Sequence, residues 1–371
     1  MNVKSMVSAL VAGGCAVVLA ATTVGFAQAP APAGGPQAGQ APADGRGGRA
    51  GGGGRAGGAG AGRAAGPQNQ VAAPIDVAQM ISALPRIAQA TPKANRRVLV
   101  FSRAGGFVHS SIPIAARTIE ALGATPVPGE LPAGRSNQAW TTVITFNIND
   151  INAQNLAQYD AVFLNNTTGQ FLDDTDPVAS EARRKALLDF VRGGKGLGGV
   201  HSATDSYHKG GGPLWQEFNH MIGGSFKFHW NFPTPITLKV DDVDNPINRS
   251  FTRANAQTGT RVAAPVMVVD EVYTFSQDSW SRDRVRTLLS VDYDRMPQVI
   301  KDQEPANGRR TDGDYGISYI RREGQGRVYV NVLGHSHEIY KIPAMLEHFL
   351  AGMQYALGDL EVDDTPVPLK K

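Results

Sequence analysis

The sequence predicts an α/β fold, built on a doubly wound and mostly parallel β-sheet with helices on both faces. Short, nearly continuous apolar runs are typical of strands that are buried on both faces of such a sheet, and Arg97–Phe101 is the first of them. Segments with helical spacing separate these runs, and this alternation favours parallel pairing. The second half of the chain changes to alternating apolar and polar residues, which predicts an added antiparallel β-hairpin region.

The first strand is followed by a glycine loop that leads into a helix. The loop passes through His109 to Ser110 or Ser111, and either serine can cap a helix expected over 112–122. Similar strand-loop-helix units recur along the first half. Further strands are expected over 143–146, 161–164 and 196–200, and further helices over 152–156 and 179–191.

The alternating segments of the second half predict four more strands. The segments 317–322 and 327–333 are joined by a glycine-rich turn, which predicts a β-hairpin. A helix over 342–355 is expected to close the domain, and a leader helix over 75–88 is expected to precede it. The other two alternating strands are expected over 234–240 and 285–292.

The N-terminus has the pattern of a secretory signal peptide. Lys4 precedes an apolar run over 6–26, and the small residues Gly25 and Ala27 fit a cleavage site after Ala27. Two alternatives remain open, namely lipidation of Cys15 and a retained membrane anchor. No other segment approaches the ~20 apolar residues that a membrane span needs. We therefore expect a periplasmic or secreted protein with no transmembrane span after signal cleavage.

Composition divides the rest of the chain. A stretch of Ala, Gly, Pro and Arg has almost nothing to bury, so we expect a disordered linker. The linker carries a charge of +3 and Lys4 adds one more, so the remainder of a chain with net charge +3 sums to about −1. A near-neutral domain predicts no nucleic-acid partner. The expected parts are a signal peptide (1–27), the linker (28–74), a leader helix and connection (75–95), a folded domain (96–357) and a C-terminal tail (358–371).

Several familiar kinds of active site are disfavoured. Cys15 is the only cysteine, so a mature chain that has lost it has no thiolate for catalysis or metal binding. The glycines of 194–198 precede an expected strand instead of following one, which is the wrong context for a dinucleotide loop. The Walker A, Gly-x-Ser-x-Gly and zincin patterns are missing as well.

Five short motifs, taken together, resemble the ThuA-like, trehalose-utilisation family. The resemblance covers roughly 96–357 and rests on the order and spacing of the motifs. It implies a flavodoxin-like fold of the class I glutamine amidotransferase-like superfamily and a role in the catabolism of trehalose or keto-glycosides. The motifs are Gly106-Phe107-Val108-His109-Ser110, Asn165-Asn166-Thr167-Thr168-Gly169, Gly198-Gly199-Val200-His201-Ser202-Ala203-Thr204-Asp205, Asp270-Glu271-Val272-Tyr273 and Gly326-Arg327-Val328-Tyr329 leading into Gly334-His335-Ser336-His337.

The same resemblance argues against glutaminase activity. In the amidotransferases a cysteine occupies a sharp elbow between strand and helix, and His201 stands at the corresponding position in this chain. An imidazole cannot replace the thiolate that attacks an amide. The late-strand histidine of those enzymes corresponds to His335, so the frame of the site is expected to be kept with different chemistry.

The candidate site residues follow from topology and chemistry. Side chains after parallel strands converge on the carboxyl edge of a sheet, so we predict that His109, His201 and His335 meet at one pocket. Glu271 can supply the carboxylate for acid-base catalysis or for a metal site. A structural role remains open for each, as a turn or loop histidine or a salt-bridged carboxylate. Candidate substrate-binding residues are Asn165, Asn166, Thr167, Asp205, Trp230, Tyr273 and His337, with Trp215 and Phe228 as further stacking candidates; His208, His220 and His229 are expected to pack or lie on the surface.

Three classes of function remain. The first is an enzyme that acts on a carbohydrate, with histidines and a carboxylate moving protons. The second is a metal-dependent hydrolase or isomerase, in which His109, His201 and His335 hold a divalent ion, the one cofactor that we consider. The third is a sugar-binding protein without catalysis. A small carbohydrate is the expected partner in all three, and the oligomeric state stays open.

Overall fold

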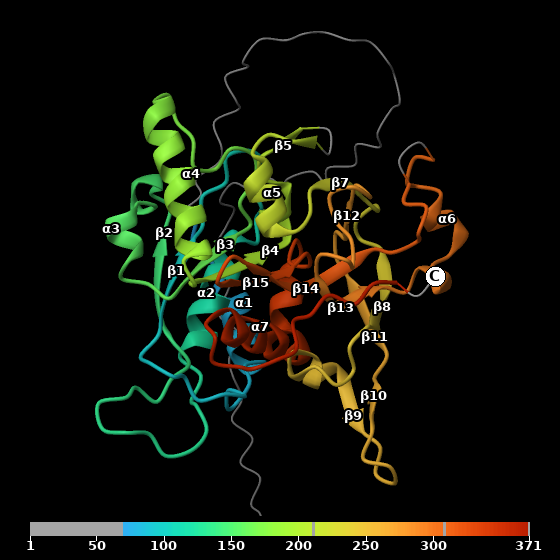
Figure 1. Cartoon of the computed structure of the whole chain (residues 1–371). Coiled ribbons are helices and arrows are strands. Elements are labelled where there is room, and N and C mark those ends of the chain that lie inside the picture. Colours follow the sequence, from blue (N-terminus) through green and yellow to red (C-terminus); the bar gives the residue numbers. More distant parts are fainter. Residues whose placement is uncertain (1–69, 210–211, 307–308, 370–371) are drawn as a thin grey trace, which may run out of the picture. The chain divides into compact units, whose positions relative to one another are not determined.

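The computed structural model describes residues 70–209, 212–306 and 309–369 (Figure 1). The expected signal peptide and nearly all of the expected linker lie outside these residues. Within the described residues, no helix has the length and apolar character needed to cross a membrane.

A mixed nine-stranded sheet forms the centre of the described part of the chain, in the order β11-β8-β13-β14-β15-β4-β3-β1-β2. Four neighbouring pairs are parallel and four are antiparallel. The expectation of a mostly parallel sheet is therefore wrong, because β14 and β15 form a hairpin and the strands beyond β14 continue its antiparallel pattern. The parallel strands are β1 (Arg97–Phe101), β2 (Thr141–Thr145), β3 (Ala161–Asn165), β4 (Gly196–Val200) and β15 (Gly326–Asn331); the others are β8 (Pro235–Val240), β11 (Val266–Val269), β13 (Arg286–Val291) and β14 (Gly316–Glu323).

Helices cover both faces of the parallel half of the sheet. Gly198 and Gly199 are successive residues of β4, so they face opposite sides. A Cβ atom on Gly198 would meet Met353 of α7 (Pro343–Ala356), whereas one on Gly199 would meet Ile222 of α5 (Gln216–Ile222). Figure 1 shows α5 and α4 (Pro177–Arg192) on one side of these strands, and α7 and α2 (Ile112–Gly123) on the other.

The helix ends follow from local chemistry. The Asp176 side chain accepts hydrogen bonds from the backbone N–H groups of Val178 and Ala179, so α4 begins two residues earlier than expected. The leader helix α1 (Pro74–Ser82) is shorter than the expected 75–88. Pro85 lacks a backbone N–H and disfavours helical geometry in the residue before it, which explains why the helix ends early.

Several short elements were not expected from the sequence. Strands of two to four residues are too short to show a periodicity, yet one such pair, β7 (Phe226–His229) and β12 (Tyr273–Phe275), lies beside the candidate site. The remaining unexpected short elements are β5 (His208–Lys209), β6 (Gly212–Pro213), β9 (Thr252–Ala254), β10 (Arg261–Ala263), α6 (Gln298–Lys301), η1 (Ile148–Asp150), η2 (His201–Asp205), η3 (Pro246–Phe251), η4 (Tyr293–Arg295) and η5 (His337–Lys341). The short helix α3 (Ala153–Leu156), in contrast, matches the helix expected over 152–156.

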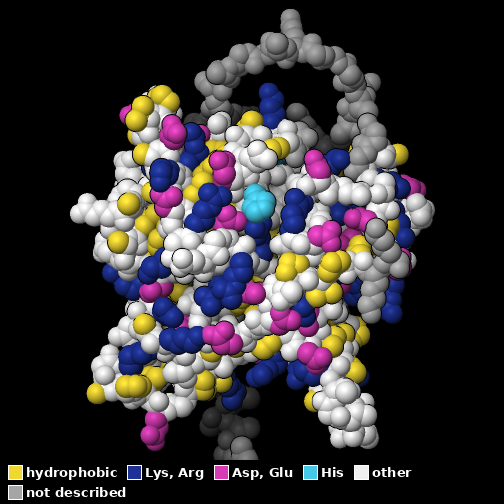
Figure 2. All heavy atoms as spheres, in the orientation of Figure 1, with side chains coloured by type: hydrophobic (Ala, Val, Ile, Leu, Met, Phe, Trp, Pro, Cys, Tyr) yellow, Lys and Arg dark blue, Asp and Glu magenta, His cyan; other side chains and the backbone are white. Residues whose placement is uncertain are grey.

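On the face shown in Figure 2, basic and acidic side chains intermingle, so neither positive nor negative charge predominates. This agrees with the near-neutral charge of the folded part of the sequence.

The parallel strands end together at one edge. Asn331 of β15 is aligned with Val200 of β4, and Val200 is aligned with Asn165 of β3. The loops that follow β1, β4 and β15 therefore leave the sheet from the same edge, and they carry the candidate site.

Candidate functional site

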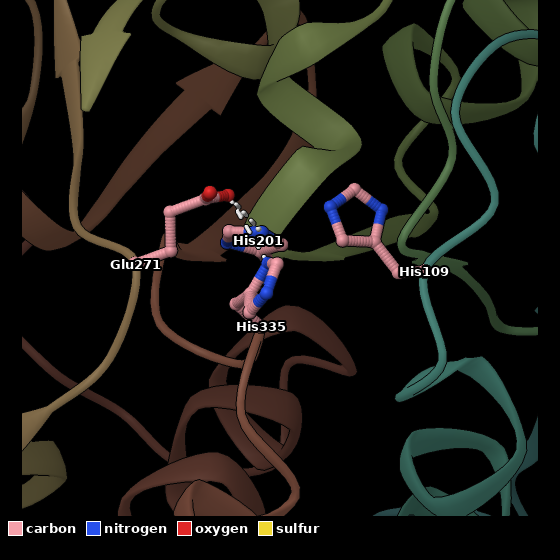
Figure 3. A group of neighbouring side chains, drawn as sticks. All are labelled: His109, His201, Glu271 and His335. Carbon is pink, nitrogen blue, oxygen red and sulfur yellow. Dashed lines mark ion pairs between the residues drawn. The ribbon is translucent and has the colours of Figure 1, made fainter. Parts of the chain in front are cut away.

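Three histidines and one glutamate meet at the carboxyl edge of the sheet (Figure 3). One nitrogen or oxygen atom from each of His109, His201, Glu271 and His335 lies within 4.8 Å of the corresponding atom of every other. The imidazole centroids are 4.7 Å apart for His109 and His201, 5.3 Å for His109 and His335, and 5.4 Å for His201 and His335. The predicted convergence of the three histidines is confirmed. We call these four residues the histidine–glutamate cluster.

Each member comes from a different loop at this edge. His201 directly follows β4 and has a left-handed backbone (φ 47°), which is uncommon for a residue other than glycine. His335 follows Gly334 (φ 128°) after β15, and His109 lies between β1 and α2. Glu271 comes from the turn between β11 and β12.

Hydrogen bonds to the rest of the protein orient two of the imidazoles. The Nδ1 atom of His201 lies 2.9 Å from the carbonyl oxygen of Val332. A carbonyl only accepts, so Nδ1 carries the proton and Nε2 is the atom that faces the cluster. His109 shares a 3.2 Å hydrogen bond with Ser202 through its own Nδ1 atom.

Two imidazole nitrogens converge on one carboxylate oxygen. The Oε2 atom of Glu271 is 3.5 Å from Nε2 of His201 and 3.1 Å from Nδ1 of His335. Both nitrogens are buried, and neither makes a hydrogen bond of good geometry with any described residue. Buried polar atoms are normally satisfied, so this arrangement points to a ligand that the four side chains would share.

The electrostatics of the cluster favour a neutral His109 beside an ionised Glu271. Burial, with repulsion from His201 and His335, lowers the pKa of His109 to about 2. Burial also lowers the pKa of His335, but contact with Glu271 outweighs it and the net pKa is raised. Burial raises the pKa of Glu271, yet its contacts with His201 and His335 bring the net pKa well below the usual range. The carboxylate is therefore charged at neutral pH.

Asp270 is a positioning residue that sequence reasoning did not single out. Its buried carboxylate accepts hydrogen bonds from the backbone N–H groups of Gly334 (2.5 Å) and Ser336 (2.7 Å). These bonds hold the loop that carries His335, while the next residue, Glu271, points into the cluster. The signal that could have revealed this role is the adjacent Asp270-Glu271 pair. The Asp270 carboxylate supports the loop, and the Glu271 carboxylate faces the histidines.

His229 and Tyr273 also border the cluster. The Nε2 atom of His229 lies 3.4 Å from Oε1 of Glu271, and its side chain is 40% exposed, so this histidine borders the cluster from the surface. The short β7–β12 pair, which the sequence did not reveal, brings it there. The Tyr273 ring lies 4.2 Å from the His201 ring between centroids. Burial, together with the charge of Glu271, holds the Tyr273 pKa well above its usual range, so its hydroxyl stays protonated.

The other predicted histidine and aspartate lie outside the cluster. His337 lies 2.8 Å from Asp76 and 3.2 Å from Ser110, at the side of the cluster. Asp205 pairs with His208 at 2.5 Å. Any imidazole that Asp205 orients is therefore that of His208.

The amide and hydroxyl side chains at the carboxyl end of β3 and just after it are buried next to the site. Asn165 donates hydrogen bonds to the Ser102 hydroxyl and the Ile112 carbonyl, both at 2.9 Å. Asn166 donates to Asn165, and Thr167 shares a hydrogen bond with Ser206. These bonds tie the loops of the sheet edge to one another, and direct contact of these three residues with substrate stays a prediction.

The aromatic side chains that are exposed beside the cluster are not those expected from the sequence. Trp230 and Tyr273 are only 1% and 3% exposed, and Trp230 packs against Tyr315, so neither offers an open ring face. Phe107 is 65% exposed with its ring 4.8 Å from that of His109, and Phe232 is 44% exposed with its ring 5.2 Å from that of His335. The position of Phe107, two residues before His109, was the only sequence signal for this pair. Trp215 is buried against Tyr207 and Phe218, and Phe228 packs against Trp230 and His229.

Comparisons with known proteins found one matching family model and solved structures of low sequence identity. The family model "ThuA: Trehalose utilisation" matches residues 97–356. A ThuA-like protein from Bacteroides uniformis ATCC 8492 is similar in structure (TM-score 0.51, 17% identity), with 71% of this chain and 93% of that chain covered. A ThuA-like protein from Parabacteroides merdae ATCC 43184 has a TM-score of 0.46 at 14% identity, with 71% and 90% covered. No curated protein matches the chain.

Proposed function

Because the chain belongs to the ThuA, trehalose utilisation family, we propose that it is an enzyme of carbohydrate catabolism whose reaction takes place at the histidine–glutamate cluster around a divalent metal ion. The family supports a carbohydrate-related role. One observation carries the metal-dependent chemistry: four potential ligand atoms lie within 4.8 Å of one another.

The spacing of the ligand atoms fits a metal centre. Metal–nitrogen and metal–oxygen bonds of about 2.0–2.2 Å in a tetrahedron place the ligand atoms roughly 3.3–3.6 Å apart. The separation of Glu271 Oε2 from His201 (3.5 Å) lies within that range, and its separation from His335 (3.1 Å) lies just below it. Imidazole and carboxylate ligands suit zinc, iron and related divalent ions. The hydrogen bond from His201 to Val332 is the kind of outer contact that orients a metal-binding histidine.

Different residues would bind the metal ion and position its ligands. A bound divalent ion would polarise a sugar oxygen or lower the pKa of a water molecule. His109, His201, His335 and Glu271 would hold it, with Asp270 fixing the loop of His335 through two backbone hydrogen bonds. The buried Tyr273 ring closes the cluster on one side.

Metal analysis and turnover together test this proposal. Protein purified without added metal should contain about one divalent ion per chain, and replacing His109, His201 or His335 with alanine should remove the ion and most turnover of a disaccharide. The partly exposed His220, on α5 and outside the cluster, offers the matched control His220→Ala. The screen should include trehalose and its oxidised keto form.

Two other outcomes would each overturn part of the proposal. Full turnover after removal of all metal would favour acid-base catalysis by the cluster itself, an alternative that the 3.1 Å contact between His335 and Glu271 supports. Sugar binding without turnover of any tested carbohydrate would favour a non-catalytic binding protein.

We further propose that the enzyme works in the periplasm or outside the cell. The support is the signal-peptide pattern before Ala27. N-terminal sequencing of the protein from its native host should find Gln28 as the first residue. An intact Met1 would contradict export by cleavage.

A further inference from the structure

A pocket lies beside the cluster and shares His335 with it. Its volume is about 350 Å³, and its lining includes Asp76, Phe232, His337 and Lys341. Pockets that hold small ligands begin at about this size. Because His335 lines the pocket and also belongs to the cluster, a molecule that reacts at the cluster can extend directly into this pocket.

The leader helix contributes to this pocket although it lies outside the residues that match the family model. Asp76 is in the first turn of α1. Its two carboxylate oxygens lie 2.8 Å from Nδ1 of His337 and 2.8 Å from Nζ of Lys341, both in η5. The buried Met80 anchors α1 to the core. Asp76 therefore fixes the two polar side chains of η5 in place at the wall of the pocket.

We propose that this pocket binds the sugar ring next to the one that reacts, so that the leader helix takes part in recognition of a neutral disaccharide or glycoside. The inference rests on the proposed function. It adds the place where the second sugar ring of the substrate would bind and the residues that would contact that ring.

The chemistry of the pocket matches a sugar ring. A pyranose presents hydroxyl groups that both donate and accept, together with an apolar C–H face. Lys341 offers a donor, Asp76 offers acceptors, the Ser110 hydroxyl can donate or accept, and the half-exposed ring of Phe232 offers a stacking surface.

The charge of the pocket argues for a neutral sugar. Lys341 is the only lysine or arginine among the described residues that line it, and the carboxylates of Asp76 (2.8 Å) and Glu338 (2.6 Å) already pair with it. A sugar phosphate would meet these two like charges and no unpaired lysine or arginine among the described residues of the pocket, which costs affinity.

Binding measurements with one-ring and two-ring sugars test the subsite. In the full chain with its metal bound, Phe232→Ala should raise the Kd for trehalose about tenfold or more, and the Kd for glucose less than about threefold. Asp76→Asn should have the same selective effect, because it releases His337 and Lys341. Metal content should stay unchanged in both variants. Val299 of α6 is another exposed apolar residue and lies outside the pocket, so Val299→Ala serves as the control.

The outcomes separate this inference from the proposed function. If wild-type protein binds trehalose and both variants keep its affinity, or lose affinity for trehalose and glucose equally, the subsite proposal fails alone. If wild-type protein binds neither sugar, the carbohydrate role and the subsite fail together, whatever the metal content. Because Phe232 is exposed, its variant should fold normally, and the melting temperature of Asp76→Asn shows whether α1 has loosened.

Discussion

His348 is expected to make the stability of the fold depend on pH. Its side chain is completely buried in α7, where Nδ1 donates to the Ile247 carbonyl (3.0 Å) and Nε2 lies 2.8 Å from the Ser318 hydroxyl. Burial lowers its pKa from 6.5 to about 4. Between these values the unfolded chain binds a proton that the folded chain does not. The stabilisation is therefore fully present above the unfolded pKa and is lost as the pH falls toward 4, by up to about 3 kcal/mol.

A difference measurement isolates this contribution. His348→Asn keeps a donor for the Ile247 carbonyl but cannot titrate, and the other ionisable groups act on both proteins alike. Urea unfolding at pH 7, 5.5 and 4 should show the stability advantage of wild type over the variant shrinking by up to about 3 kcal/mol as the pH falls. An advantage that is the same at all three values would refute the reasoning. Metal content at pH 7 should not change, because His348 lies outside the histidine–glutamate cluster.

Three further outcomes are expected. Gly198→Ala should lower the free energy of unfolding by about 1–3 kcal/mol, because the new Cβ atom would lie 2.5 Å from both Met353 and Phe163; an unchanged melting temperature would show that these side chains move freely. A truncated chain that starts at Gln68 should have the same melting temperature as the full mature chain, since the removed segment has almost no apolar side chains. A melting temperature several degrees lower would contradict this. His201→Cys should show no glutaminase activity, because a thiol alone lacks the tuned base and oxyanion donors, and release of ammonia from glutamine would show otherwise.

The three cluster histidines could be predicted because each follows a parallel strand. Successive members are 92 and 134 residues apart in the sequence, yet β1, β4 and β15 all end at one edge. Glu271 could not be placed in this way, because it enters from a turn among antiparallel strands. It was proposed for its chemistry, and the structure brings it to the histidines.

The aromatic residues show where sequence reasoning stops. An aromatic side chain contributes a large apolar surface whether it packs in the core or stacks on a ligand, so its type does not distinguish the two roles. Trp230 and Tyr273 are buried, whereas Phe107 and Phe232 are open because loops display them. Likewise, the pairing of Asp76 with η5 depends on how α1 packs, which no local pattern contains.

The left-handed backbone of His201 costs folding stability at a position where the side chain belongs to the proposed reaction site. Glycine or asparagine would occupy this backbone conformation with less strain, and the difference is worth about 1–2 kcal/mol for an ordinary residue. A search for more stable variants would therefore tend to replace this histidine, and with it a member of the histidine–glutamate cluster. Any engineering of this protein for heat resistance should hold position 201 fixed, because there a gain in robustness and a loss of reactivity arise from the same substitution.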